Sequence, residues 1–118
     1  MVQGEIRKEV NMKYPISYAV NPPSKLFEIN ELEEKFFETL YSKLPEKVNE
    51  KIHLIRMATG TLAVECVGYC IGRIKLQGNK HEMQIITSLY DSYVVQDDFV
   101  KHIDEWVKFI NEYIVKEL

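Results

Sequence analysis

The stretch TLAVECVGYCIGRIKLQ, residues 61–77, decides the predicted fold of this chain. Its odd-numbered positions are polar or charged toward both ends and apolar only in the middle, at Val67, Tyr69 and Ile71. None of its even-numbered positions carries a charge; they are Leu62, Val64, Cys66, Gly68, Cys70, Gly72, Ile74 and Leu76. Because successive side chains of a strand point to opposite faces, this alternation predicts a half-buried β-strand.

A single flat strand over this stretch would reach roughly 55 Å, which is too long for so small a domain. We expect a bulge or sharp bend at Gly68 or Gly72, so the stretch forms either one bent strand or two. A helix over residues 62–71 is the alternative, since apolar side chains also recur there at every fourth position. The two glycines and the β-branched residues favour the strand.

Two neighbouring segments are predicted to pair with this stretch. Residues 52–58 are mostly apolar, and Thr59-Gly60 can form a tight turn after them. Gly78-Asn79 suits a two-residue hairpin turn that leads into residues 80–88. The first half of the long strand then pairs with 52–58 and its second half with 80–88.

Two-residue turns fix the expected register of both hairpins. The expected partners are Lys75 with Glu82, Ile74 with Met83, Ile71 with Ile86, Ile55 with Val64, and Ile52 with Val67. Opposite charges and apolar pairs across neighbouring strands support this register. A slip by one residue would turn Arg73 and Lys75 into the core.

Two helices enclose these strands in sequence. Asn30 and Glu33 have the spacing of a capping box, and Pro45 disfavours helical geometry just before it, which predicts a helix over about 31–44. A second helix over about 98–116 has Asp97 or Asp98 as its N-cap. Its continuous apolar stripe consists of Phe99, Ile103, Trp106, Val107, Ile110 and Ile114.

The predicted fold class is α+β, with two layers. An antiparallel meander of three to four strands has one helix before it and one long helix after it, both packed on one sheet face. Residues 1–118 form a single domain, and residues 1–24 form a less regular N-terminal arm with a short strand around 16–20. Residues 93–95 add a short edge strand. The core face consists of Leu62, Val64, Cys66, Ile74, Leu76, Met83 and Ile85.

Composition limits the class of protein. Hydrophobic residues make up 46% and charged residues 28%, which is too apolar for a disordered chain. The net charge of −3 argues against binding nucleic acid over the whole surface, although a local basic patch is compatible with it. No apolar run approaches the roughly 18 residues that span a bilayer, and the N-terminus lacks a signal-peptide core. We therefore expect a cytoplasmic protein.

The other face of the sheet carries the residues from which we predict function. The register collects apolar side chains there, and the predicted interaction surface is Ile52, Leu54, Val67, Tyr69, Ile71 and Ile86. Such a patch is normally covered. Either residues 1–30 fold over it, or another subunit or protein does. Our first hypothesis is a non-enzymatic interaction module, a homo-oligomer (dimer) or a binder of another protein.

Two other functions are weaker alternatives. The first is nucleic-acid binding at the hairpin rim, with phosphates held by Arg73, Lys75 and Lys80 and bases stacked on Tyr69 and Tyr90. The second is an enzyme or metal site at His53 and Cys66, which the expected register places opposite each other.

The remaining predictions are negative. No complete catalytic or metal-binding motif is present, so we predict no catalytic residues, no metal and no cofactor. We expect Cys66 and Cys70 to be buried free thiols, because in one strand their Cα atoms would be roughly 13 Å apart, beyond disulfide reach. These residues identify no family.

Overall fold

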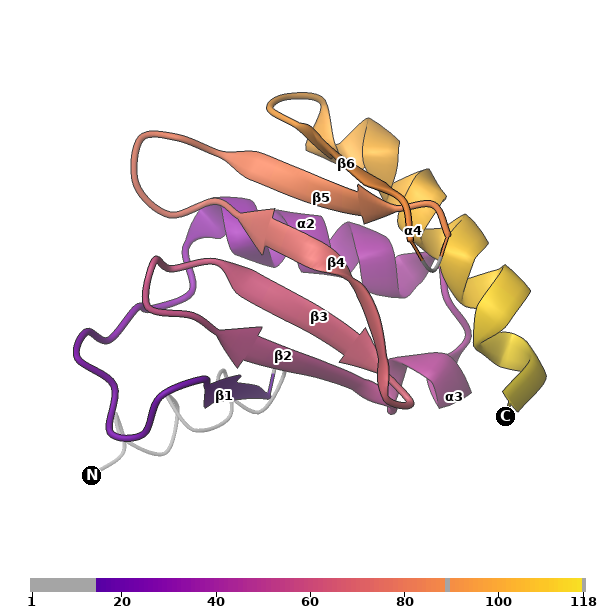
Figure 1. Ribbon diagram of the computed structural model, residues 1–118, viewed down its shortest axis with the longest axis horizontal. Helices are drawn as coiled ribbons and strands as arrows, with labels where there is room; N and C mark the ends of the chain where they lie inside the picture. The colour runs from indigo at the N-terminus through magenta and orange to yellow at the C-terminus, as the bar shows by residue number, and fades with distance from the viewer. Residues whose placement is uncertain (1–14, 89, 118) are drawn as a thin grey trace.

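The computed structural model describes residues 15–88 and 90–117 (Figure 1). Its strands form one sheet in the order β1-β2-β3-β4-β5-β6. The elements in chain order are β1 (Ile16–Tyr18), α2 (Glu31–Ser42), α3 (Glu46–Asn49), β2 (Ile52–Arg56), β3 (Leu62–Cys66), β4 (Tyr69–Lys75), β5 (Glu82–Ile86), β6 (Ser92–Val95), α4 (Phe99–Tyr113) and the 3-10 turn η1 (Val115–Glu117).

The fold is α+β, as predicted, but the sheet is larger than the predicted meander. Within the described residues it has six strands and is mixed, because β1 pairs in parallel with β2 while the other neighbours are antiparallel. A short strand after Pro15 and an edge strand at residues 92–95 both exist. The additional strands arise because residues 61–77 divide into β3 and β4 and because β1 joins the edge beside β2.

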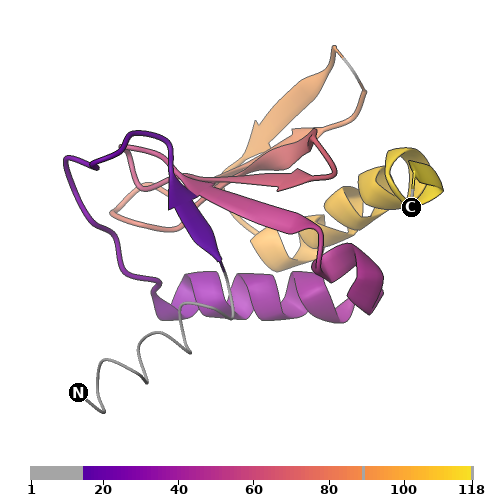
Figure 2. The ribbon, with the colours of Figure 1, turned by 90° about the horizontal axis from the view of Figure 1, so that it is seen from below.

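The helices pack on one face of the sheet. Figure 2 shows α2 and α4 beneath the twisted sheet, with α3 beside the end of α2. The predicted core face is correct: Leu62, Val64, Cys66, Ile74, Leu76, Met83 and Ile85 are all buried. Trp106 of α4 and Phe36 of α2 meet edge to face between the helices and the sheet, with ring centroids 5.3 Å apart.

Helix α2 begins as its sequence predicts. Asn30 Oδ1 accepts a hydrogen bond from the Glu33 backbone N–H at 2.9 Å, and Glu33 Oε1 accepts one from the Asn30 backbone N–H at 3.1 Å. This reciprocal pair satisfies two backbone donors at the start of the helix. Helix α4 departs from the prediction: its N-cap residue Asp98 has φ 53 and its side chain makes no capping hydrogen bond.

Residues 61–77 fold back on themselves. Val67 and Gly68 have φ 52 and 83 and connect the paired residues Cys66 and Tyr69. Positive φ at both central positions is the geometry of a two-residue hairpin turn that matches the twist of its strands. The bulge or sharp bend expected at Gly68 is therefore a complete reversal of the chain, and the stretch forms two strands.

A β-bulge follows this turn. Val64 pairs with Gly72 while its neighbour Glu65 pairs with Cys70, so Ile71 is the additional residue on β4. Because a bulge shifts the alternation by one residue, Ile71 is buried in the core and Cys70 is exposed. The expectation that both cysteines are buried is wrong for Cys70.

The register between β2 and β3 also differs from the prediction. Arg56 pairs with Leu62, and the connecting loop covers residues 57–61 instead of Thr59-Gly60 alone. Ile52 therefore faces Cys66, not Val67. A shift of one residue moves every side chain of a strand to the other face. This shift turns Ile52, Leu54 and Arg56 toward the helices.

Strands β4 and β5 pair as predicted around their turn, with Lys75 opposite Glu82 and Ile74 opposite Met83. Farther along, the indole N–H of Trp106 donates to the Gln84 carbonyl oxygen at 2.9 Å. A Cβ on Gly72 would lie 2.5 Å from that oxygen and 2.8 Å from the indole ring. The glycine thus allows the tryptophan to approach the backbone of both strands.

Candidate binding surfaces

The residues predicted as an interaction surface do not share an exposed face. Ile52, Leu54 and Ile71 are buried in the core, because of the β2–β3 register and the bulge in β4. Tyr69 and Ile86 are half-buried and pack against the core. Val67 is 42% exposed in the β3–β4 turn. The predicted apolar patch on the outer sheet face is therefore wrong, because Ile52, Leu54 and Ile71 were assigned to the outer face but lie on the core side.

The outer face of the central strands is mostly polar. The pairs that lie there include His53 with Glu65, Glu65 with Cys70, and Lys75 with Glu82. Charged and polar side chains surround the apolar pair of Ile55 and Ala63 on this face, so the centre of the sheet lacks the apolar character of a large docking surface. Within the segment predicted to cover this face, Ile16–Tyr18 instead extend the β2 edge as β1, and residues 1–14 lie outside the described residues.

His53 and Cys66 do not form a site. His53 pairs with Glu65 on the exposed face, whereas Cys66 pairs with Ile52 and is buried beneath the helices. The Cys66 thiol lies 4.0 Å from the Val48 carbonyl oxygen. Within residues 15–88 and 90–117, no group of three or more His, Cys, Asp and Glu side chains is arranged to hold a metal ion.

Neither thiol has the properties of an activated nucleophile. Burial raises the pKa of the Cys66 thiol. Cys70 reaches the surface, but partial desolvation by the surrounding residues still raises its pKa, against the lowering effects of a backbone hydrogen bond at Gly72 and the positive charge of Arg73. A raised pKa reduces the thiolate fraction at neutral pH, and the thiolate is the reactive form.

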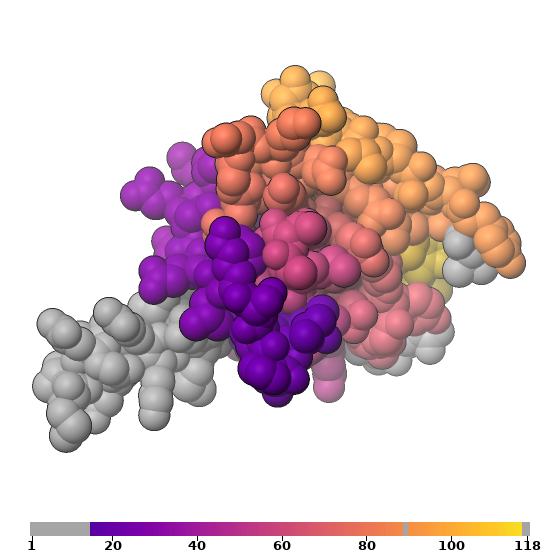
Figure 3. Space-filling model, turned by 60° about the vertical axis from the view of Figure 1, so that its left-hand side comes forward, coloured from indigo at the N-terminus to yellow at the C-terminus, as the bar shows by residue number. Residues whose placement is uncertain are grey.

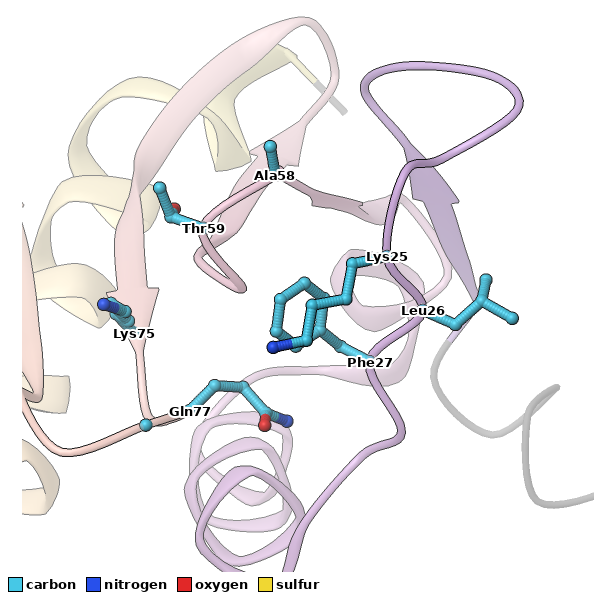
Figure 4. A pocket seen from close by; sticks show the side chains of 8 residues that line it. Lys25, Leu26, Phe27, Ala58, Thr59, Lys75 and Gln77 are labelled. Carbon is cyan, nitrogen blue, oxygen red and sulfur yellow. The ribbon is translucent and has the colours of Figure 1, made fainter.

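A cleft of about 360 Å³ opens where the segment between β1 and α2, residues 19–30, meets the β2–β3 and β4–β5 loops; from here on this segment is called the arm. Figure 3 shows β1 and the beginning of the arm, in indigo, against the pink surface of the neighbouring strands. Figure 4 shows Lys25 and Lys75 on opposite sides of this cleft, with the Lys25 side chain across the Phe27 ring, Gln77 below the two lysines and Leu26 directed away. We call it the arm cleft; its lining residues are Lys25, Leu26, Phe27, Ala58, Thr59, Lys75, Gln77 and Gly78.

A buried ion pair supports the base of the arm cleft. Arg56 Nη1 donates to Glu33 Oε2 at 2.6 Å and to the Gly60 carbonyl oxygen at 2.9 Å, and both side chains are inaccessible to solvent. Gln77 Nε2 donates to Glu33 Oε1 at 2.9 Å and to the Glu28 carbonyl oxygen at 2.8 Å. These contacts join the arm, α2 and both loops, so the lining side chains project from a fixed base.

The residues predicted to contact nucleic acid are only partly brought together. Lys75 lines the arm cleft, while Arg73 and Lys80 are exposed on β4 and in the β4–β5 turn. Tyr69 packs against the core, whereas Tyr90 is 94% exposed beyond the other end of β5, so the two rings do not form a shared stacking surface. Sequence reasoning missed Lys25, which lies in an irregular segment without periodicity.

Strand β6 presents an unusual edge. It pairs with β5 on one side and has no strand neighbour on the other among the described residues (Figure 1). Tyr93 is 43% and Val94 is 54% exposed. Asp91 precedes the strand, and Asp97 and Asp98 follow it. The edge surface, as we call it, consists of Tyr90, Asp91, Ser92, Tyr93, Val94, Asp97 and Asp98.

Comparison with known proteins adds no functional assignment. No family model, no curated protein and no solved structure matches this chain. None of the helices in the described ranges is long and apolar enough to cross a bilayer. The two surfaces must therefore be interpreted from their own geometry and charge.

Proposed function

We propose that this chain is a non-enzymatic protein-interaction module that binds an extended segment of a partner along β6. The observation that carries the proposal is the unpaired edge of a strand whose side chains Tyr93 and Val94 are half-exposed and apolar. An edge strand presents free backbone N–H and C=O groups, and an added strand satisfies them while pockets beside it select side chains.

The composition of β6 supports this function. Exposed edges of native sheets usually contain lysine, proline or a bulge that prevents further pairing. Residues Ser92–Val95 include neither lysine nor proline, and their pairing with β5 has no register shift. The opposite edge is protected, because β1 has only three residues and follows Pro15 directly. Of the two edges, β6 is the one that accepts another strand.

Charge at the ends of β6 indicates the chemistry of the partner. Asp91, Asp97 and Asp98 flank the strand, and residues 90–100 include no lysine or arginine. A partner segment with apolar residues in its centre and basic residues at its ends would match this pattern. We therefore propose a basic, extended peptide segment as the occupant.

A second copy of the chain fits less well. Antiparallel pairing of two β6 strands must keep matching faces together, so either Tyr93 lies opposite Tyr93 or Val94 lies opposite Val94. The first register places Asp91 diagonally beside Asp97 of the other copy, and the second places these residues directly opposite. Like charges in such positions destabilise a strand pair. Self-association, which the sequence led us to expect, is therefore the alternative that the experiment below must distinguish from binding of a basic peptide.

The test uses a fluorescent peptide of alternating valine and threonine with two lysines at each end, titrated with the protein while anisotropy is measured. We expect saturable binding that weakens with salt, is lost in Val94→Lys, and falls about tenfold in Asp97→Lys. Glu50→Lys is the matched control, because it reverses an exposed charge near the other edge of the sheet. A peptide with glutamates at its ends should bind at least tenfold less.

Three results would overturn the proposal. If the lysine-ended and glutamate-ended peptides bind with equal affinity, the site does not select a basic partner. If Val94→Lys binds the lysine-ended peptide as tightly as the wild-type protein does, the β6 edge is not the binding site. Light scattering measures the mass in solution and tests whether a second copy is the partner, because one chain has a mass of 13.9 kDa and a dimer has twice that mass. A dimer that Val94→Lys converts to monomer would assign β6 to self-association instead of a basic partner. Circular dichroism of each variant verifies that the fold is retained.

A further inference from the structure

We infer that the arm cleft binds a phosphate group through the ammonium groups of Lys25 and Lys75. This site is independent of the edge surface, since the arm cleft lies at the left end of the sheet in Figure 1 and β6 forms its upper edge. The two lysines are separated by about fifty positions in sequence, yet they line one cleft from opposite sides (Figure 4).

The charges of the two lysines are not neutralised by ion pairs. Within the described residues neither ammonium forms a salt bridge; Lys25 Nζ instead lies 4.9 Å from the centre of the Phe27 ring. The buried Arg56–Glu33 pair beneath the cleft contributes no net charge. The neighbouring acidic residues are Glu28, which follows Phe27 in sequence, and Glu82, which lies opposite Lys75 on β5. Neither lines the cleft, so the lining itself carries two positive charges and no negative charge in a chain whose net charge is −3.

The shape of the arm cleft limits the ligand. Its volume of about 360 Å³ is at the lower end of ordinary ligand sites, which is larger than phosphate alone requires and suits a phosphorylated small molecule. The Phe27 ring has Lys25 on it and the Arg56 guanidinium 5.5 Å from its centroid, so the ring is occupied by cations instead of being free for base stacking. Recognition would rest on charge and on the Thr59 hydroxyl at the rim.

The phosphate could belong to a free nucleotide or to a nucleic-acid backbone, and the experiment separates these sources. Inorganic phosphate, a nucleoside monophosphate and a single-stranded oligonucleotide are titrated into labelled protein at low salt, and backbone amide and lysine resonances are followed by NMR. We expect the nucleoside monophosphate to bind more tightly than inorganic phosphate and to shift the signals of Lys25, Lys75 and Thr59. An oligonucleotide that binds more than tenfold tighter would assign the phosphate to nucleic acid.

Variants determine whether the two lysines form the site. Lys25→Gln and Lys75→Gln should each weaken nucleotide binding about tenfold, and the double variant should abolish it. Lys80→Gln is the matched control, because Lys80 is an exposed cation in the adjacent turn that does not line the cleft. A similar loss in Lys80→Gln would show only diffuse attraction to the rim. That result, or the absence of ligand-induced shifts in the wild-type protein, would overturn the inference.

Discussion

The buried pair of Arg56 and Glu33 allows the strongest quantitative prediction about this fold. Glu33→Gln preserves the length of the side chain and its ability to accept from the Asn30 N–H, but it removes the negative charge beside the guanidinium. Arg56→Met removes the positive charge and keeps an apolar stem of similar length. The double variant Glu33→Gln/Arg56→Met removes both charges together.

The magnitude follows from burial. The Arg56 and Glu33 side chains are 0% and 1% exposed, and Arg56 Nε has no hydrogen-bond partner among the described residues. Removing one partner of such a pair costs about 3–5 kcal/mol, because the remaining charge is buried without compensation. Arg56→Met should lie at the lower end, since Glu33 still accepts from Asn30 and Gln77. The double variant should lose about 2–3 kcal/mol less than the sum of the single variants.

Urea unfolding followed by far-UV circular dichroism measures these free energies. Asp104→Asn is the matched control, because Asp104 pairs with Lys43 at 2.9 Å but the two side chains are 69% and 39% exposed. An exposed pair contributes about 0–1 kcal/mol. The reasoning is refuted if both single variants lose less than about 1 kcal/mol, or if their effects add within about 0.5 kcal/mol.

Two further predictions concern the folded-back stretch. Val67→Asn should stabilise the protein by about 1 kcal/mol in urea unfolding, because valine at φ 52 is strained and Asn-Gly favours this turn; no gain, or a loss, would contradict the strain. Because desolvation raises the pKa of both thiols, a disulfide reagent should modify Cys70 slowly at neutral pH and faster as the pH approaches 9, whereas the buried Cys66 should be protected until unfolding. In the Cys70→Ser variant Cys66 is the remaining cysteine, so modification of this folded variant as fast as the wild-type protein would contradict the prediction.

Much of the core could be predicted from local patterns alone. The alternation in residues 61–77 identified the buried positions Leu62, Val64 and Ile74, and the capping box located the start of α2. The hairpin at Gly78-Asn79 has the predicted register, with Lys75 opposite Glu82. These features depend on residues close in sequence, where side-chain period and turn chemistry carry the information.

The β2–β3 register could not be obtained in this way. The predicted two-residue turn at Thr59-Gly60 put Arg56 on the outer face together with Ile52 and Leu54, and nothing in the sequence opposes this because a charged side chain is normally exposed to solvent. Arg56 is instead buried because Glu33, Gly60 and Gln77 come together around it from distant parts of the chain. Only tertiary contacts show that this charge is compensated. Once Arg56 faces the helices, the alternation of β2 carries Ile52 and Leu54 with it.

The Val67-Gly68 turn was missed for a different reason. Gly68 indicated only a bulge or bend, because valine resists the positive φ that a two-residue turn between Cys66 and Tyr69 requires at Val67. The bulge at Ile71 then restores the burial of even positions farther along β4, at Gly72 and Ile74. The same pattern of buried even-numbered positions is therefore compatible with both one long strand and a bulged hairpin.

This ambiguity determines where function is sought. If residues 61–77 were one strand, Tyr69 and Ile71 would lie on the outer face and mark the centre of the sheet as a docking surface. The hairpin and bulge turn them toward the core, which leaves the central outer face charged and mixed. The groups that we propose for binding then lie at the margins of the sheet: exposed apolar side chains along β6, and lysine charges at the arm cleft. Both margins consist of short or irregular segments, which are too short for hydrophobic periodicity to predict which side chains are exposed.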